Sequence, residues 1–215
     1  MGRKSISELS VALINLQSDD LSVQKTGLKK MLSYATQELG GRSLPVREWF
    51  LNIKNSDKYF ATADWNMSPK ILSGLFRCFH FICERMIDHP VMWSDFPKTH
   101  EVDEYKGRLR QLALQYMEHP ASDVRADVAY CLALLGDGLA WDLYMNIIQK
   151  KPSYCGWLEI ALTRYGKFSL SGVQKKNLEA VLITVENKSK NSSVKRQARS
   201  IIALIAPLEQ PLISI

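Results

Sequence analysis

Residues 122–136 read SDVRADVAYCLALLG, and this stretch decides the fold class. Small or apolar residues recur along it at helical spacing, and the break at Gly136-Asp137 ends the pattern. Similar segments cover most of the remaining sequence. The nearest thing to a strand, KFSLSGV at 167–173, is too short and too rich in serine. The sequence therefore predicts an all-α protein.

The predicted helices are regular in the second half of the chain and less regular in the first. Short breaks in the second half force consecutive helices to pack antiparallel as neighbours. In the first half, a capping box starts one helix at Ser5 and a proline begins another at Pro69. Two long loops are expected, at about 55–67 and 90–101. The predicted helices lie at 5–16, 20–39, 45–53, 69–88, 102–118, 122–135, 138–149, 153–165, 171–187 and 192–206.

An internal repeat supports a stacked arrangement of helix pairs. Helices aligned on Val124 and Val194 share small or apolar residues four, eight and eleven positions later, and a fainter copy starts at Val23. A further partial copy starts at Leu158, which gives a period of about 35 residues, as two-helix repeats require. We therefore expect Val124, Leu132, Ile201 and Ile202 to be buried.

The segment Asp123-Val124-Arg125, followed by Ala129, Leu132 and Leu135-Gly136, resembles the second helix of a HEAT-type repeat. The resemblance is clearest over residues 102–206. It implies a right-handed α-solenoid of about five antiparallel helix pairs. It also implies that Asp123 and Arg125 stack between neighbouring repeats. The tetratricopeptide pattern has a similar period, but its signature residues are not found.

Length and composition predict a single domain over residues 1–215, because a chain of 24.5 kDa can bury a core without disulfide or metal staples. It divides into an irregular half (1–101), the regular repeats (102–206) and a tail (207–215). We expect no signal peptide and no membrane segment. Four cysteines are too few for a secreted disulfide scaffold. These features together predict a cytoplasmic location.

The sequence contains no motif for catalysis, for metal binding or for cofactor binding. We therefore expect no catalytic residues, no bound metal and no cofactor. Phosphate-binding glycine loops and a nucleophile elbow are missing, and no two cysteines have zinc-binding spacing. We interpret the cysteines as buried free thiols. Trp141-Asp142 and Trp157 are similar to residues of HEAT-like alkylpurine DNA glycosylases, which use Trp and Asp in a basic groove. A dipeptide match carries no catalytic role to this chain.

Positive charge is concentrated in one third of the chain. Residues 150–200 hold 11 Lys and Arg against 3 Asp and Glu, whereas residues 1–149 hold 17 against 18. Such a segment can bind a phosphate backbone or an acidic protein, or it can be only a solvated surface. The candidate residues for an anionic partner are Lys175, Lys176, Lys195, Arg196 and Arg199.

Aromatic residues in the two predicted loops form a second candidate site. Loop aromatics are candidate hot spots for a partner, although large aromatics also fold back to cover a core. These residues are Tyr59, Phe60, Trp65, Trp93 and Phe96.

Together these patterns predict a non-enzymatic binding or scaffold protein that holds one macromolecular partner, most simply a protein. An immunity-type inhibitor and an adaptor are two forms of this hypothesis, and the partner can be acidic. The alternative is a nucleic-acid-binding protein or glycosylase-like enzyme that uses the basic third. If the chain is a protein-binding scaffold, we expect only weak, non-specific nucleic-acid binding. Aromatic residues that could stack on bases are missing among the basic residues after Phe168. No membrane partner or small-molecule substrate is predicted.

Overall fold

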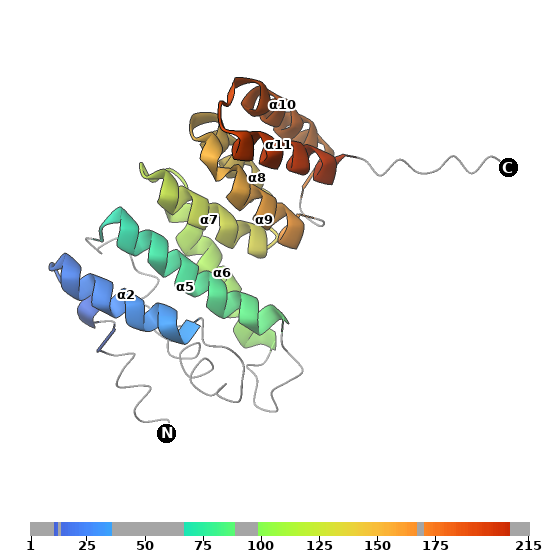
Figure 1. Ribbon diagram of the computed structural model, residues 1–215. Coiled ribbons are helices and arrows are strands. Elements are labelled where there is room, and N and C mark those ends of the chain that lie inside the picture. The colour runs from blue at the N-terminus through green and yellow to red at the C-terminus, as the bar shows by residue number, and fades with distance from the viewer. Residues whose placement is uncertain (1–10, 13, 36–66, 89–98, 167–169, 207–215) are drawn as a thin grey trace.

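The computed structural model describes residues 11–12, 14–35, 67–88, 99–166 and 170–206 (Figure 1). Within these ranges every regular element is a helix, and the predicted all-α class is confirmed. Residues 11–12 and 14–16 form helix ahead of α2. The other helices are α2 (Leu21–Ala35), α5 (Pro69–Asp88), α6 (Thr99–Gln115), α7 (Ser122–Leu134), α8 (Leu139–Lys150), the 3-10 helix η2 (Pro152–Tyr154), α9 (Cys155–Tyr165), α10 (Gly172–Lys188) and α11 (Ser192–Ile205).

The predicted helix boundaries agree closely with the structure from residue 122 onward. The helix predicted at 102–118 instead begins at Thr99 and ends at Gln115, so the loop predicted at 90–101 ends earlier than expected. The helix predicted at 45–53 and nearly all of the loop at 55–67 lie outside the described residues.

Local capping explains why the helices begin and end where they do. In α10, Ser171 and Gln174 form a reciprocal capping box, and in α11 the side chain of Asn191 accepts from the first backbone N–H groups. Gly136 ends α7 with a φ of 73°, a conformation that suits glycine. There the N–H of Asp137 donates to the carbonyl of Leu132, which closes a Schellman motif.

The helices lie in two layers, which Figure 1 shows as a stack. One layer runs in the order α2, α5, α7, α9 and α11, each helix packed on the next. On the other side, α6 packs on α5 and α7, α8 packs on α7 and α10, and α10 packs on α11. The first layer brings α5, α7 and α9 side by side although about 30 residues separate α5 from α7 along the chain.

The repeat positions lie in the core between the layers. Val124, Leu132 and Ile201 are fully buried, as predicted, while Ile202 is only partly buried against the core. In the fainter N-terminal copy Gly27 is buried, and a Cβ there would lie only 2.6 Å from the carbonyl oxygen of Ala12. The small residue at this offset therefore allows the first two helices to approach closely.

Within the described part of the chain, no helix has both the length and the apolar character that crossing a bilayer requires.

The buried position of Val124 gives a test of the core. Val124→Asp places an unpaired charge in a packed helix interface, so we expect the free energy of unfolding to fall by about 3 kcal/mol or more. Val173→Asp is the matched control, since Val173 is 71% exposed on α10. Urea denaturation followed by circular dichroism measures both. Equal midpoints for Val124→Asp and the wild type would contradict the repeat alignment.

Candidate functional site

The residues predicted to contact a partner through aromatic loops lie outside the described part of the chain. These are Tyr59, Phe60, Trp65, Trp93 and Phe96. Their role stays a prediction.

The predicted basic site is spread over the two ends of one helix pair. Lys175 and Lys176 lie at the start of α10, while Lys195 and Arg196 lie at the start of α11. Because these two helices form an antiparallel hairpin (Figure 1), the two pairs of residues lie toward opposite ends of it, roughly 15 Å apart along its axis at 1.5 Å of rise per residue. Arg199 lies between them and its Nε donates to Glu186 at 2.5 Å. The five residues do not form one compact patch.

The Trp-Asp dipeptide that resembles a glycosylase site is not arranged as a groove. Trp141 is fully buried and stacks with Tyr144, with ring centroids 6.4 Å apart. Asp142 points to the surface, where the side-chain amide of Gln174 donates to it at 3.1 Å. The Trp141 ring is therefore a core residue and presents no face to a base.

The structure instead gathers polar and aromatic side chains on adjacent faces of three helices, here called the α5–α7–α9 surface. On α5 and α7 these residues recur at intervals of three or four, which places them on one face of each helix, and residues of η2 and α9 contact them there. None of the residues predicted from the sequence to contact a partner belongs to it, although Asp123 and Trp157 took part in the two family resemblances. It comprises Ser73, Arg77, His80 and Glu84 of α5, Asp123, Asp127 and Tyr130 of α7, and Tyr154, Trp157, Arg164 and Tyr165 of η2 and α9.

A buried carboxylate organises one half of this surface. Asp127 is 4% exposed, and its two oxygens accept hydrogen bonds from the hydroxyl of Ser73 and from Nε of Arg77, the latter at 2.9 Å. The guanidinium of Arg77 lies 5.2 Å from the centre of the Trp157 ring, within cation–π range. Arg77 is thus held in one orientation by a carboxylate and an indole.

A small cavity opens beside this arginine. Its volume is about 200 Å³, and it lies between α5, α7 and η2. The hydroxyl of Tyr154 donates to the carboxylate of Asp123 at its edge. The lining residues are Arg77, Asp123, Ala126, Asp127, Ser153, Tyr154 and Trp157.

A second network occupies the other half of the surface. The hydroxyl of Tyr165 donates to Glu84 at 2.8 Å, and Arg164 donates to the same carboxylate oxygen at 2.5 Å. His80 lies 3.2 Å from the Tyr165 oxygen through its Nε2. Because the one hydroxyl proton of Tyr165 goes to Glu84, His80 must donate its Nε2–H to Tyr165. The ring of Tyr130 packs against His80 at 4.2 Å between centroids.

Burial dominates the electrostatics of this surface. It lowers the pKa of His80 to about 3, and the charge of Arg164 adds to the effect, so the imidazole is neutral. Burial also raises the pKa of the Asp127 carboxyl, while the hydrogen bonds from Arg77 and Ser73 oppose it. Each of these groups is engaged with its neighbours, so what the surface offers a partner is a fixed arginine and several aromatic faces.

The cysteines lie inside the protein. All four are buried free thiols, and burial raises the pKa of Cys78 and Cys83 to about 12. Within the described residues, His, Cys, Asp and Glu side chains do not gather in groups of three or more as metal ligands would.

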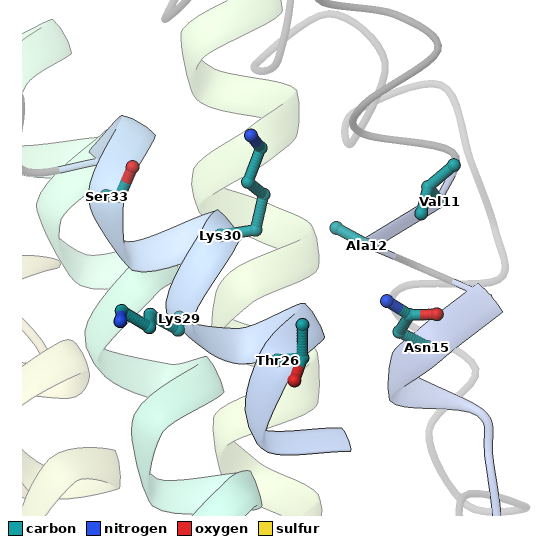
Figure 2. A pocket seen from close by; sticks show the side chains of 7 residues that line it. All are labelled: Val11, Ala12, Asn15, Thr26, Lys29, Lys30 and Ser33. Carbon is teal, nitrogen blue, oxygen red and sulfur yellow. The ribbon is translucent and has the colours of Figure 1, made fainter. Parts of the chain in front are cut away.

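Two further cavities lie away from the α5–α7–α9 surface. One of about 430 Å³ lies between residues 11–16 and α2, and it is lined by Val11, Ala12, Asn15, Thr26, Lys29, Lys30 and Ser33 (Figure 2). Figure 2 shows these side chains on facing segments of helix. The other, about 580 Å³, lies between the end of α8, η2 and α10, and includes Gln149, Val181 and Lys188.

The two residues implied to form a HEAT-type ladder do not contact each other. Asp123 accepts from Tyr154 in the next helix pair, and Arg125 donates to Ser122 at 3.3 Å in its own helix. Asp123 therefore does link neighbouring helix pairs, but through a tyrosine.

Comparisons of this chain with protein-family models, with curated proteins and with solved structures find no match.

The neutral His80 gives a test of the second network. An unfolded histidine has a pKa of about 6.5, whereas that of His80 is lowered to about 3. The unfolded state therefore binds more protons in this window, and stability present above pH 6.5 is lost as the pH falls, by at most about 1.4 kcal/mol per unit. We expect His80→Phe to remove this dependence in urea denaturation between pH 6.5 and 4.

His100→Phe is the control, because His100 is exposed on α6. It should keep the wild-type dependence of stability on pH. If the free energy of unfolding depends on pH equally in His80→Phe and in the wild type, His80 is protonated equally in the folded and unfolded states. That result would contradict the lowered pKa of His80.

Proposed function

We propose that this chain is a non-enzymatic binding protein, a HEAT-like right-handed α-solenoid that holds one protein partner on its α5–α7–α9 surface. The two-layer order of helices supports the solenoid, since each helix packs mainly on its neighbours in the stack. Immunity-type inhibition and adaptor function are both forms of this proposal. A location in the cytoplasm accords with four reduced cysteines.

The observation that carries the proposal is the fixed position of Arg77 between Asp127 and Trp157. Arginine, tyrosine and tryptophan are the residues that dominate binding energy at protein interfaces. Here Arg77, Tyr154 and Trp157 meet on one surface and are held by contacts within the protein. A side chain that is already ordered loses less conformational entropy when a partner binds.

The chemistry of the surface also favours binding over catalysis. His80 is 3% exposed and neutral, so it cannot reach a substrate in solution. Both oxygens of Asp127 already accept hydrogen bonds. A cavity of about 200 Å³ is smaller than the roughly 300–1,000 Å³ of ordinary small-molecule sites.

A capture experiment tests this proposal. The tagged protein is used as bait in a lysate of the source organism, and bound proteins are quantified by mass spectrometry. We expect Trp157→Ala to reduce capture of one protein at least tenfold, since truncated hot spots cost about 2 kcal/mol or more. Ile183→Ala is the control, because Ile183 is an exposed apolar residue on α10. Equal capture by all variants would contradict the proposal.

The alternative function is nucleic-acid binding through the basic third. The observation that favours it is exposure: Lys175, Lys176 and Arg196 all lie on the surface. Their separation over two ends of the α10–α11 hairpin limits how many phosphates one end can contact.

Salt dependence separates the two functions. If Lys195, Arg196 and Arg199 contact phosphates, affinity for duplex DNA should fall with a log–log slope of about −3, at roughly −0.9 per phosphate. Replacing all three by Glu should then abolish binding to every sequence equally. We expect only weak, non-specific binding in gel-shift titrations at two salt concentrations. Sub-micromolar binding that falls with this slope and is lost in the triple replacement would favour the alternative.

A further inference from the structure

One carboxylate beside the small cavity forms no ion pair within the described residues. Asp127 forms an ion pair with Arg77, so these two charges compensate each other. Asp123 is exposed, and its hydrogen-bond partner is the uncharged hydroxyl of Tyr154. Arg77, Asp123 and Asp127 are the charged residues of the lining, so the lining carries a net charge of about −1. Lys151 lies outside the lining, with its Nζ 6.0 Å from the centre of the Tyr154 ring.

We propose that this cavity receives a lysine or arginine side chain of a protein partner, with Asp123 as the counter-ion. The stem of that side chain packs along the rings of Tyr154 and Trp157, which line the same cavity. This inference rests on the proposed function, because it names the chemistry of the partner at that surface.

The size of the cavity selects the kind of occupant. A volume of about 200 Å³ is below the roughly 300–1,000 Å³ that small-molecule sites occupy, but it accommodates one side chain. The lining from η2 consists of Ser153 and Tyr154, and α7 contributes Asp123 and Ala126. An inserted side chain thus contacts two consecutive helix pairs.

The sign of the charge selects a cation over an anion. Arg77 is the cation of the cavity wall, and its Nε is already engaged by Asp127 at 2.9 Å. An anion placed beside Arg77 would also face the carboxylates of Asp123 and Asp127, which repel it. A cation beside Asp123 is attracted by a carboxylate whose hydrogen-bond partner is a neutral hydroxyl.

The hydrogen bond from Tyr154 supports this role. It holds the exposed Asp123 side chain against η2, so the carboxylate is positioned before a partner arrives. An ordered carboxylate beside aromatic rings loses less entropy on pairing than a free surface carboxylate does.

Model peptides test the inference directly. The probes are blocked glycine pentapeptides with arginine, lysine or glutamate at the central position. The readout is the indole N–H resonance of Trp157 in a ¹⁵N-labelled sample, assigned among five tryptophans by its loss in Trp157→Phe. We expect saturable shifts with the arginine or lysine peptide at concentrations up to roughly 20 mM, the range for one side chain, and none with glutamate.

Variants of the carboxylate complete the test. Asp123→Asn keeps an acceptor for Tyr154 and removes only the charge, so the dissociation constant should rise by roughly fivefold or more. Asp142→Asn is the matched control, since it removes an exposed carboxylate on α8 and should leave the affinity unchanged. The inference is overturned by a shift with the glutamate peptide, by no shift with either cationic peptide, or by equal affinity in Asp123→Asn.

The failure of this inference and of the proposed function are distinguishable. If Trp157→Ala loses the captured protein and Asp123→Asn retains it fully, the protein-binding surface stands and the cationic occupant is wrong. If Trp157→Ala retains the protein, the surface itself is wrong.

Discussion

The carboxylate of Asp127 is buried between α5 and α7, where Ser73 and Arg77 donate hydrogen bonds to it. A buried charge without such partners would destabilise the fold by several kcal/mol, roughly 3–5 by analogy with broken buried ion pairs. This requirement fixes how α5 lies against α7. It also fixes Arg77 above Trp157, and so connects α9 to the same pair of helices. The α5–α7–α9 surface depends on this one pairing.

The burial of α7 explains why the pairing has this importance. Ten of its thirteen residues are buried, because α5, α6, α8 and α9 all pack on it. A polar side chain in such a helix must find a partner inside the protein. Tyr130 is buried on the same helix and contacts His80, Trp157 and Tyr165, so aromatic packing continues the connection between the three helices. The surface available to a partner is therefore rigid.

Helix positions could be predicted from the sequence because capping and breaks are local. Gly136 and Ser171 mark helix ends through contacts within a few residues. The surface could not be predicted in the same way, since Ser73 and Asp127 are 54 residues apart and pair only after folding. One signal was present: Asp127 is the only charged residue from Ala126 to Leu134, in the buried part of α7. A charge at such a position indicates a buried partner on another helix.

The central claim is that the α5–α7–α9 surface, rather than the basic α10–α11 pair, is where a partner binds. Hydroxyl-radical footprinting of the protein alone and in complex with its captured partner tests it most directly. Our account predicts that oxidation of Trp157 and Tyr154 falls on binding, while that of the exposed Val173 on α10 is unchanged. Unchanged oxidation of Trp157, together with protection of Val173 and Leu204, would contradict it.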